Sequence, residues 1–244
     1  MLATGGRQTS PRAARGLTVK WRLALIDSCG SWPEAADAAA FISAGERAER
    51  RATVADPGGH GSRIAQLLTA GDAPFELLLG QVFMTCGPAS SAAVAAAIDW
   101  AVAGRANLIH MSLGLSADRA VLGSAIRRAI GLDCIIVASM PARGAPVYPA
   151  AYPHVIRATG DARCAPGELS CLVPGFFGGC TRFGSGGQSD CEGAANVGGA
   201  SVGAAWVTRS ILSGPVYGTR AVVDALTARA RYIGPERRGT MTAG

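Results

Sequence analysis

The chain has 244 residues, of which 49% are hydrophobic and 16% charged, and its formal net charge at pH 7 is +6. This composition excludes a mainly disordered chain and fits one globular domain with a sizeable core. The arginines gather mainly in the two tails and in residues 45–52 with little aromatic interleaving, so nucleic acid is not expected as a partner, and a mildly basic surface that attracts acidic peptides explains the charge as well.

The apolar segments are too short to predict a membrane span, and residues 1–16 contain arginines but no apolar core of a secretion signal. We therefore expect a cytoplasmic protein that does not enter a membrane. The sequence gives no indication of its oligomeric state.

Seven cysteines occur, an odd number, and none forms a C-x-x-C pair. Four of them lie in one loop-rich stretch at wide, irregular spacing: Cys164, Cys171, Cys180 and Cys191. This spacing argues against a zinc site, and a reducing compartment disfavours disulfides. Free and mostly buried thiols are the expectation, and the role of the four-cysteine stretch is left open.

Apolar segments alternate with helical patterns through the first part of the chain. In chain order we predict a strand at 20–27, helix-compatible sequence at 35–51, a helix at 59–71, a strand at 74–83, a helix at 90–104, a strand at 107–114, a helix at 117–131 and a strand at 134–139. This alternation predicts an α/β fold: a doubly wound, mostly parallel sheet with helices on both faces.

After Pro141 the sequence is rich in Gly, Pro and Cys up to residue 199, with short strands predicted at 154–160 and 168–173. Helical pattern returns at 201–212 and near 221–232. No repeat or second domain is visible. We expect one domain over 17–235, between mobile tails at 1–16 and 236–244.

Residues 199–203 read GASVG, a G-x-S-x-G pattern that is typical of nucleophilic serines but also of small residues packing a helix closely on a sheet. The α/β-hydrolases place the histidine after the serine. All three histidines here, His60, His110 and His154, precede Ser201. That order excludes the α/β-hydrolase interpretation.

The order Asp, His, Ser is available instead. Asp27 ends a predicted strand, while His60 and Ser201 open predicted helices. Strand ends and helix starts meet at the carboxyl edge of a parallel sheet, where open α/β proteins build their sites. The main-chain N–H of Ser201, at a helix N-terminus, would also face a developing oxyanion.

Three segments carry a family resemblance. LALIDSCG at 23–30, GGHGSRIAQLL at 58–68 and GGASVGAAWVTRSIL at 198–212 resemble the aspartate, histidine and serine segments of the subtilisin-like serine proteases. The segments at 98–114 and 148–160 resemble the parts of that family that lead into its substrate cleft. The likeness covers about residues 20–213 in the correct order.

The resemblance implies that Asp27 orients and supports His60, that His60 takes a proton from Ser201 and passes it to the leaving amine, and that Ser201 attacks the peptide carbonyl. It implies that Ser112, Leu113 and Gly114 pair with an extended substrate, and that Gly87 lies on the opposite wall of the cleft. No cofactor or metal is implied. His110 and His154 are interpreted as structural.

The sequence also departs from the family. Pro141, which has no N–H, stands where the family has the oxyanion-hole asparagine, and loss of one such donor costs about 2.7–4 kcal/mol. Asn196 and Ser139 are candidate replacements; otherwise the enzyme is slow or inactive. Ala205 and Trp206 replace the family's Pro-His after the serine, and we recognise neither a calcium-site ligand set nor a chaperone-length propeptide.

We therefore expect an intracellular serine endopeptidase that cleaves a restricted peptide or protein precursor. It resembles the small cytoplasmic subtilisin-like enzymes that remove leader peptides, as in quinohemoprotein amine dehydrogenase maturation. The alternative is a weak or inactive pseudoprotease that binds or chaperones a peptide. The cleavage-site preference does not follow from the sequence.

Overall fold

The computed structural model describes residues 20–45, 47–85, 87–183, 199–215 and 218–236. The expected tails at 1–16 and 236–244 therefore lie outside the described residues, apart from Glu236. Within the described part, no helix has both the length and the apolar character needed to cross a membrane.

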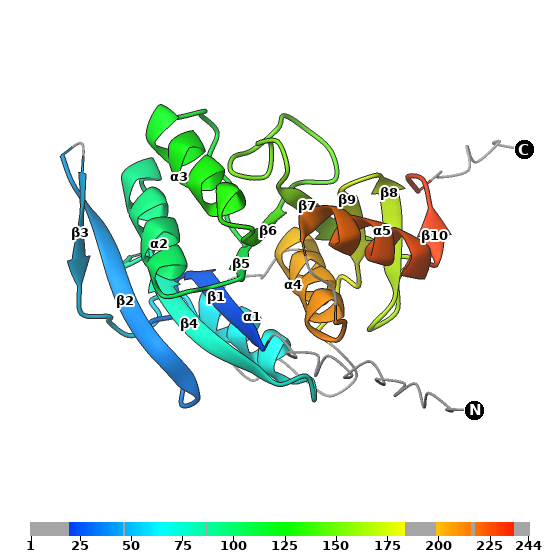
Figure 1. Ribbon diagram of the computed structural model, residues 1–244, viewed down its shortest axis with the longest axis horizontal. Coiled ribbons are helices and arrows are strands. Elements are labelled where there is room, and N and C mark those ends of the chain that lie inside the picture. The colour runs from blue at the N-terminus through cyan, green and yellow to red at the C-terminus, as the bar shows by residue number, and fades with distance from the viewer. Residues whose placement is uncertain (1–19, 46, 86, 184–198, 216–217, 237–244) are drawn as a thin grey trace, which may run out of the picture.

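A ten-stranded, mostly parallel sheet forms the centre of the described structure, in the order β10-β8-β9-β7-β6-β5-β1-β4-β2-β3 (Figure 1). The strands are β1 (Trp21–Asp27), β2 (Ala35–Ala44), β3 (Arg47–Arg51), β4 (Phe75–Gln81), β5 (Leu108–Met111), β6 (Ile135–Ser139), β7 (Ile156–Gly160), β8 (Leu169–Val173), β9 (Phe176–Gly179) and β10 (Tyr232–Ile233). Only the β2–β3 and β8–β9 pairs among them are antiparallel.

Helices cover both faces of the sheet. They are α1 (His60–Thr69), α2 (Ser91–Ala103), α3 (Ala120–Gly131), α4 (Gly199–Leu212) and α5 (Thr219–Arg229). Leu23 and Leu25 of β1 belong to the core under α1, α4 and α5, whereas Ala24 and Ile26 belong to the core under α2 and α3. This alternation along one strand confirms the predicted doubly wound α/β fold.

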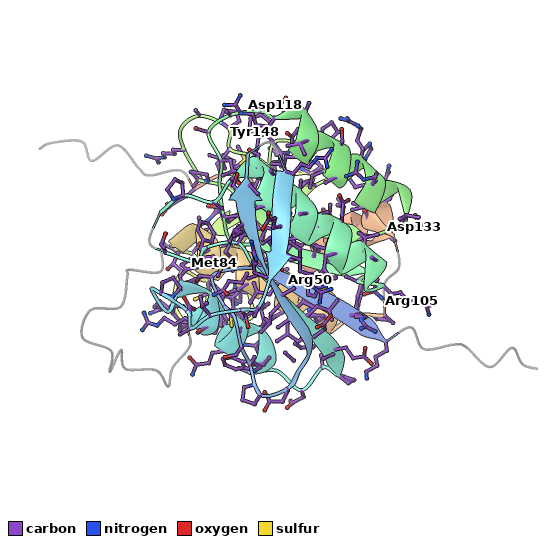
Figure 2. The ribbon with its side chains drawn as sticks, turned by 90° about the vertical axis from the view of Figure 1, so that its left-hand side faces the viewer. Arg50, Met84, Arg105, Asp118, Asp133 and Tyr148 are labelled. Carbon is purple, nitrogen blue, oxygen red and sulfur yellow. The ribbon has the colours of Figure 1, made fainter. Side chains whose placement is uncertain are left out.

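The helix expected over 35–51 is wrong, because this segment forms the β2–β3 hairpin. Its alanines favour a helix intrinsically, but β2 pairs in parallel with β4, with Ala38 opposite Leu79. Gly45 turns the chain at a left-handed φ of 64°. Figure 2 faces this hairpin and labels Arg50, whose guanidinium lies 6.0 Å from the centre of the Trp100 ring on α2.

Smaller differences concern element ends. Strands β9 and β10 were not predicted. Helix α5 covers 219–229 rather than 221–232, because Tyr232 pairs with Ser170 and begins β10. Such short strands carry too few residues for a periodic signal.

Glycines bring α4 directly onto the sheet. A Cβ at Gly203 would lie 2.0 Å from the carbonyl oxygen of Thr159 on β7, and one at Gly179 on β9 would lie 2.5 Å from the carbonyl oxygen of Gly203. No side chain fits into either approach. The last glycine of the G-x-S-x-G pattern is therefore needed for packing, and it fixes the height of α4 above the sheet.

Candidate active site

Three predicted residues meet at the carboxyl edge of the sheet. Asp27 is the last residue of β1, His60 is the first of α1, and Ser201 is in the first turn of α4. The His60 Nδ1 lies 2.8 Å from Asp27 Oδ1, and the His60 Nε2 lies 3.2 Å from Ser201 Oγ. The structure thus joins a carboxylate, an imidazole and a hydroxyl in one hydrogen-bonded line.

The Asp27 carboxylate is buried, with 1% of its surface exposed. Its Oδ1 accepts hydrogen bonds from the Ser28 main-chain N–H at 2.7 Å and the Ser28 hydroxyl at 3.3 Å, besides facing His60. All of these contacts are made by Oδ1, which accepts from each of these donors, whereas Oδ2 is buried without a hydrogen-bond partner among the described residues. The His60 Nδ1 therefore carries its proton toward Asp27, which leaves the Nε2 lone pair free to accept from Ser201.

Ser28 also fixes the start of α1 against the end of β1. Its hydroxyl accepts a hydrogen bond from the Gly61 N–H at 2.8 Å. A Cβ at Gly61 would come within 2.3 Å of the Cys29 main-chain nitrogen, so only glycine allows this approach. The distance between His60 and Asp27 is thereby set by the backbone and not by flexible side chains.

Asp56, which the sequence analysis did not name, holds the turn before His60. Its Oδ1 accepts from the Gly59 N–H at 2.9 Å, and its Oδ2 accepts from both the N–H and the hydroxyl of Ser62 at 2.7 Å. Burial would raise the pKa of Asp56, but the bonds from Ser62 hold it below its usual value. An acid four residues before a helix-opening histidine is the signal that would have found it.

The pKa of His60 is raised above its usual 6.5. Burial by itself lowers this pKa, but the hydrogen bond and the charge of Asp27, together with the charge of Asp56, outweigh the burial. Two carboxylates therefore stabilise the imidazolium form, which a general base must adopt after it takes a proton.

A cavity of about 310 Å³ opens beside His60. It is lined by Asp27, Ser28, Pro57, Gly58, His60, Phe83, Thr85, Gly87 and Ser112. The structure therefore brings two predicted substrate-binding residues, Gly87 and Ser112, to the same cavity. The Leu113 side chain packs in the core with 4% of its surface exposed, and the exposed Gly114 lies against Val147, so their main-chain pairing with an extended substrate stays a prediction.

The oxyanion-hole candidates are only partly described. Pro141 lies in an exposed loop after β6, and Ser139 is buried at the end of that strand. Asn196 lies outside the described residues, as does Cys191. Trp206 does not border the cleft: it is buried, and its Nε1 donates to the carbonyl oxygen of Arg182 at 2.9 Å.

The other two histidines differ from each other. His110 is fully buried on β5, between Thr208 and Ser112. His154 is exposed, with a left-handed φ of 64°, just before β7. No group of three metal-ligating side chains occurs among the residues that the structure describes.

No family model matches the chain, but two comparisons find similar proteins. The solved structure of Sphericase superposes with a TM-score of 0.56 at 20% identity, over 87% of this chain and 86% of that one. The chain has the subtilisin-like fold. "Minor extracellular protease Epr" of Bacillus subtilis (strain 168) is 30% identical over 113 residues, which is 41% of this chain.

The chain covers 18% of the length of Epr. The subtilisin-like fold and this partial sequence match together support a relation to the subtilisin-like proteases.

Proposed function

We propose that this protein is a serine endopeptidase of the subtilisin-like type, with Asp27, His60 and Ser201 as its catalytic residues. The observation that carries the proposal is the line of hydrogen bonds from the Asp27 carboxylate through both nitrogens of His60 to the Ser201 hydroxyl. A buried carboxylate, an imidazole with a raised pKa and a hydroxyl within its reach are the parts that acyl transfer needs.

The reaction uses these groups in order. The Ser201 Oγ attacks the peptide carbonyl carbon while its proton passes to His60 Nε2. The imidazolium is stabilised by Asp27 and gives that proton to the leaving amine, so the peptide C–N bond breaks and an acyl-serine forms. Water then repeats the sequence, and the acid product leaves with Ser201 and His60 restored. The main-chain N–H groups of the first turn of α4 support the tetrahedral oxyanion.

The substrate in this proposal is an extended peptide or a protein precursor, cleaved at one site. The cavity beside His60 is lined by the side chains of Phe83 and Pro57 and by Gly87, which favours a small or apolar residue of the substrate. Removal of a leader peptide is a maturation step that needs cleavage at one site. The cytoplasmic location expected from the sequence stays a prediction.

Active-site labelling tests the proposal. A fluorophosphonate probe should form one covalent adduct on Ser201, and Ser201→Ala or His60→Ala should abolish it. Ser43→Ala is the matched control, because the Ser43 hydroxyl lies in the exposed hairpin, where it donates to the Gly45 carbonyl oxygen. Absence of any adduct on the folded wild-type chain would refute the hydrolase.

Substrate choice needs a second experiment. Candidate precursors that carry a leader are incubated with wild-type protein that reacts with the probe, and their masses are followed by mass spectrometry. A single mass loss at the leader boundary supports the restricted specificity, whereas cleavage at many sites of an unfolded protein such as casein contradicts it.

Pro141 favours a second function, a peptide-binding module without turnover. A proline in the loop after β6 cannot supply the second oxyanion donor. The two functions are separated by the probe: a module that binds precursor peptides but shows no adduct at Ser201 is a pseudoprotease.

A further inference from the structure

A buried polar chain lies directly behind Ser201. The Nδ1 of His110 lies 2.8 Å from Thr208 Oγ1, and its Nε2 lies 2.7 Å from Ser112 Oγ. The Ser112 hydroxyl in turn lies 3.5 Å from the main-chain carbonyl oxygen of Ser201. This series of hydrogen bonds therefore starts at Thr208 and ends at Ser201, both on α4, and crosses the end of β5 between them.

The three side chains have almost no contact with solvent. His110 and Thr208 are 0% exposed and Ser112 is 8% exposed. Burial, together with the nearby charge of His60, lowers the pKa of His110 to about 3. At neutral pH His110 is therefore a neutral imidazole with one donor and one acceptor nitrogen.

Counting protons shows which atom donates and which accepts in each of these hydrogen bonds. The Ser112 hydroxyl donates its only proton to the Ser201 carbonyl oxygen, so it accepts from His110, whose Nε2 must carry the proton. The Nδ1 of His110 is then an acceptor and takes the proton of the Thr208 hydroxyl. Among the hydrogen bonds of the described residues, this is the arrangement that gives every donor an acceptor, and it specifies the tautomer of His110 with its proton on Nε2.

We propose that His110 is a positioning residue that ties Ser112, on the wall of the cavity beside His60, to the helix that carries Ser201. This inference rests on the proposed function, since its readout is the reactivity of Ser201. Thr208 lies two turns after Ser201 on α4, and Ser112 lies two residues after His110. The two hydrogen bonds of one imidazole thus fix the position of the cavity wall relative to α4, which carries Ser201.

A neutral histidine suits this place better than a charged group. His60 becomes positively charged when it takes the proton of Ser201, and a second positive charge nearby would oppose that step. An imidazole that stays neutral supplies two directional hydrogen bonds without this repulsion.

A double-mutant cycle between Thr208→Val and Ser112→Ala tests the inference. Thr208 and Ser112 have no hydrogen bond to each other among the bonds of the described residues, and both contact His110. If they act through His110, each single variant slows fluorophosphonate labelling of Ser201 by about tenfold, and the double variant is no slower than the slower single one. Additive slowing of about a hundredfold would overturn the inference.

Thr227→Val is the matched control. Thr227 lies on α5, outside the lining of the cavity beside His60, and its hydroxyl donates to the Val223 carbonyl oxygen at 2.7 Å. This variant should label at the wild-type rate. Equal slowing by Thr227→Val and Thr208→Val would show a general loss of stability and would overturn the positioning role.

The tautomer gives a readout that does not depend on reactivity. In ¹⁵N-imidazole NMR spectra of the full chain, His110 should show the proton on Nε2 at neutral pH and a pKa of about 3. Thr208→Val should shift this tautomer equilibrium. A proton on Nδ1 in the wild-type protein would overturn the inference, whereas failure of the wild-type chain to label would overturn the proposed function and this role with it.

Discussion

The protonation of one residue, His60, decides when the proposed nucleophile can be activated. Only the neutral imidazole can take a proton from Ser201, and Asp27 and Asp56 both favour the charged form. The same raised pKa stabilises the fold: this contribution is fully present below pH 6.5 and is lost as the pH rises through the pKa of the folded state. Reactivity and this part of the stability therefore change in opposite directions with pH.

The labelling rate of Ser201 should fall as the pH is lowered, with its midpoint above 6.5 because the pKa of His60 is raised. Measurement of the second-order labelling rate from pH 5 to 9 gives the midpoint. A midpoint below 6.5 would contradict the electrostatic assignment.

Asp56→Asn should move that midpoint to lower pH, since one of the charges that favours the imidazolium is removed. Asp99→Asn is the control. Asp99 on α2 forms an exposed ion pair with Arg128 on α3, and these helices lie on the opposite face of the sheet from His60. An unchanged midpoint in Asp56→Asn would show that Asp56 acts only on the turn.

Among the elements, the contact of α4 with β7 and β9 is the one that places the nucleophile. Gly203 lies two residues after Ser201 and has no room for a side chain against Thr159. A substitution here cannot be absorbed by a rotamer change, because the neighbouring atoms belong to the backbone.

Gly203→Ala should destabilise the protein by about 1–3 kcal/mol and slow the labelling of Ser201, since α4 must move away from the sheet. Urea unfolding measures the first effect. Gly131→Ala, at the open end of α3 with no atom within 4 Å of the added Cβ, should change the stability by less than about 1 kcal/mol. Equal effects of the two variants would contradict this account of the packing.

At the scale of the whole molecule, the reactivity of the buried thiols measures how well the two hydrophobic cores exclude solvent and reagents. Cys29, Cys134, Cys164, Cys171 and Cys180 are free and buried. Burial raises the pKa of Cys134 to about 12, and burial together with the charge of Asp161 raises that of Cys164 to about 11. Protonated, enclosed thiols are poor nucleophiles.

Cys86 and Cys191 lie outside the described residues, so both are replaced by serine for this test. The five remaining thiols should react with a disulfide reagent only when the protein unfolds. The thiol signal and the circular dichroism signal should therefore follow one urea transition. Rapid reaction of any thiol in native buffer would reveal local opening of a core.

The sequence predicts the central sheet well, because residues 23–26 of β1 and 135–138 of β6 are continuous apolar runs, and burial on both faces of the sheet requires that pattern. The hairpin at 35–51 could not be predicted in the same way, because its alanines have no strand preference of their own and adopt one only beside β4.

The residues of the candidate site also differ in whether a local sequence pattern predicts them. Asp27, His60 and Ser201 each lie in a short segment with its own local pattern, so their meeting could be expected before the structure was known. The link from His110 to Thr208 joins positions 98 residues apart in the chain, and no local pattern encodes it. The bonds of Asp56 reach only to Gly59 and Ser62, so a closer reading of the segment before His60 could have found them. The group that replaces the oxyanion donor lost at Pro141 stays a prediction.

The place of α4 in the chain has a consequence for timing during synthesis. β1 and α1 are made early, so the carboxylate and imidazole exist long before residue 201 leaves the ribosome. The hydroxyl joins them only after α4 has docked on β7 and β9, which follow most of the sheet in the chain. The proposed catalytic line therefore cannot form in a growing polypeptide until its own sheet is almost complete.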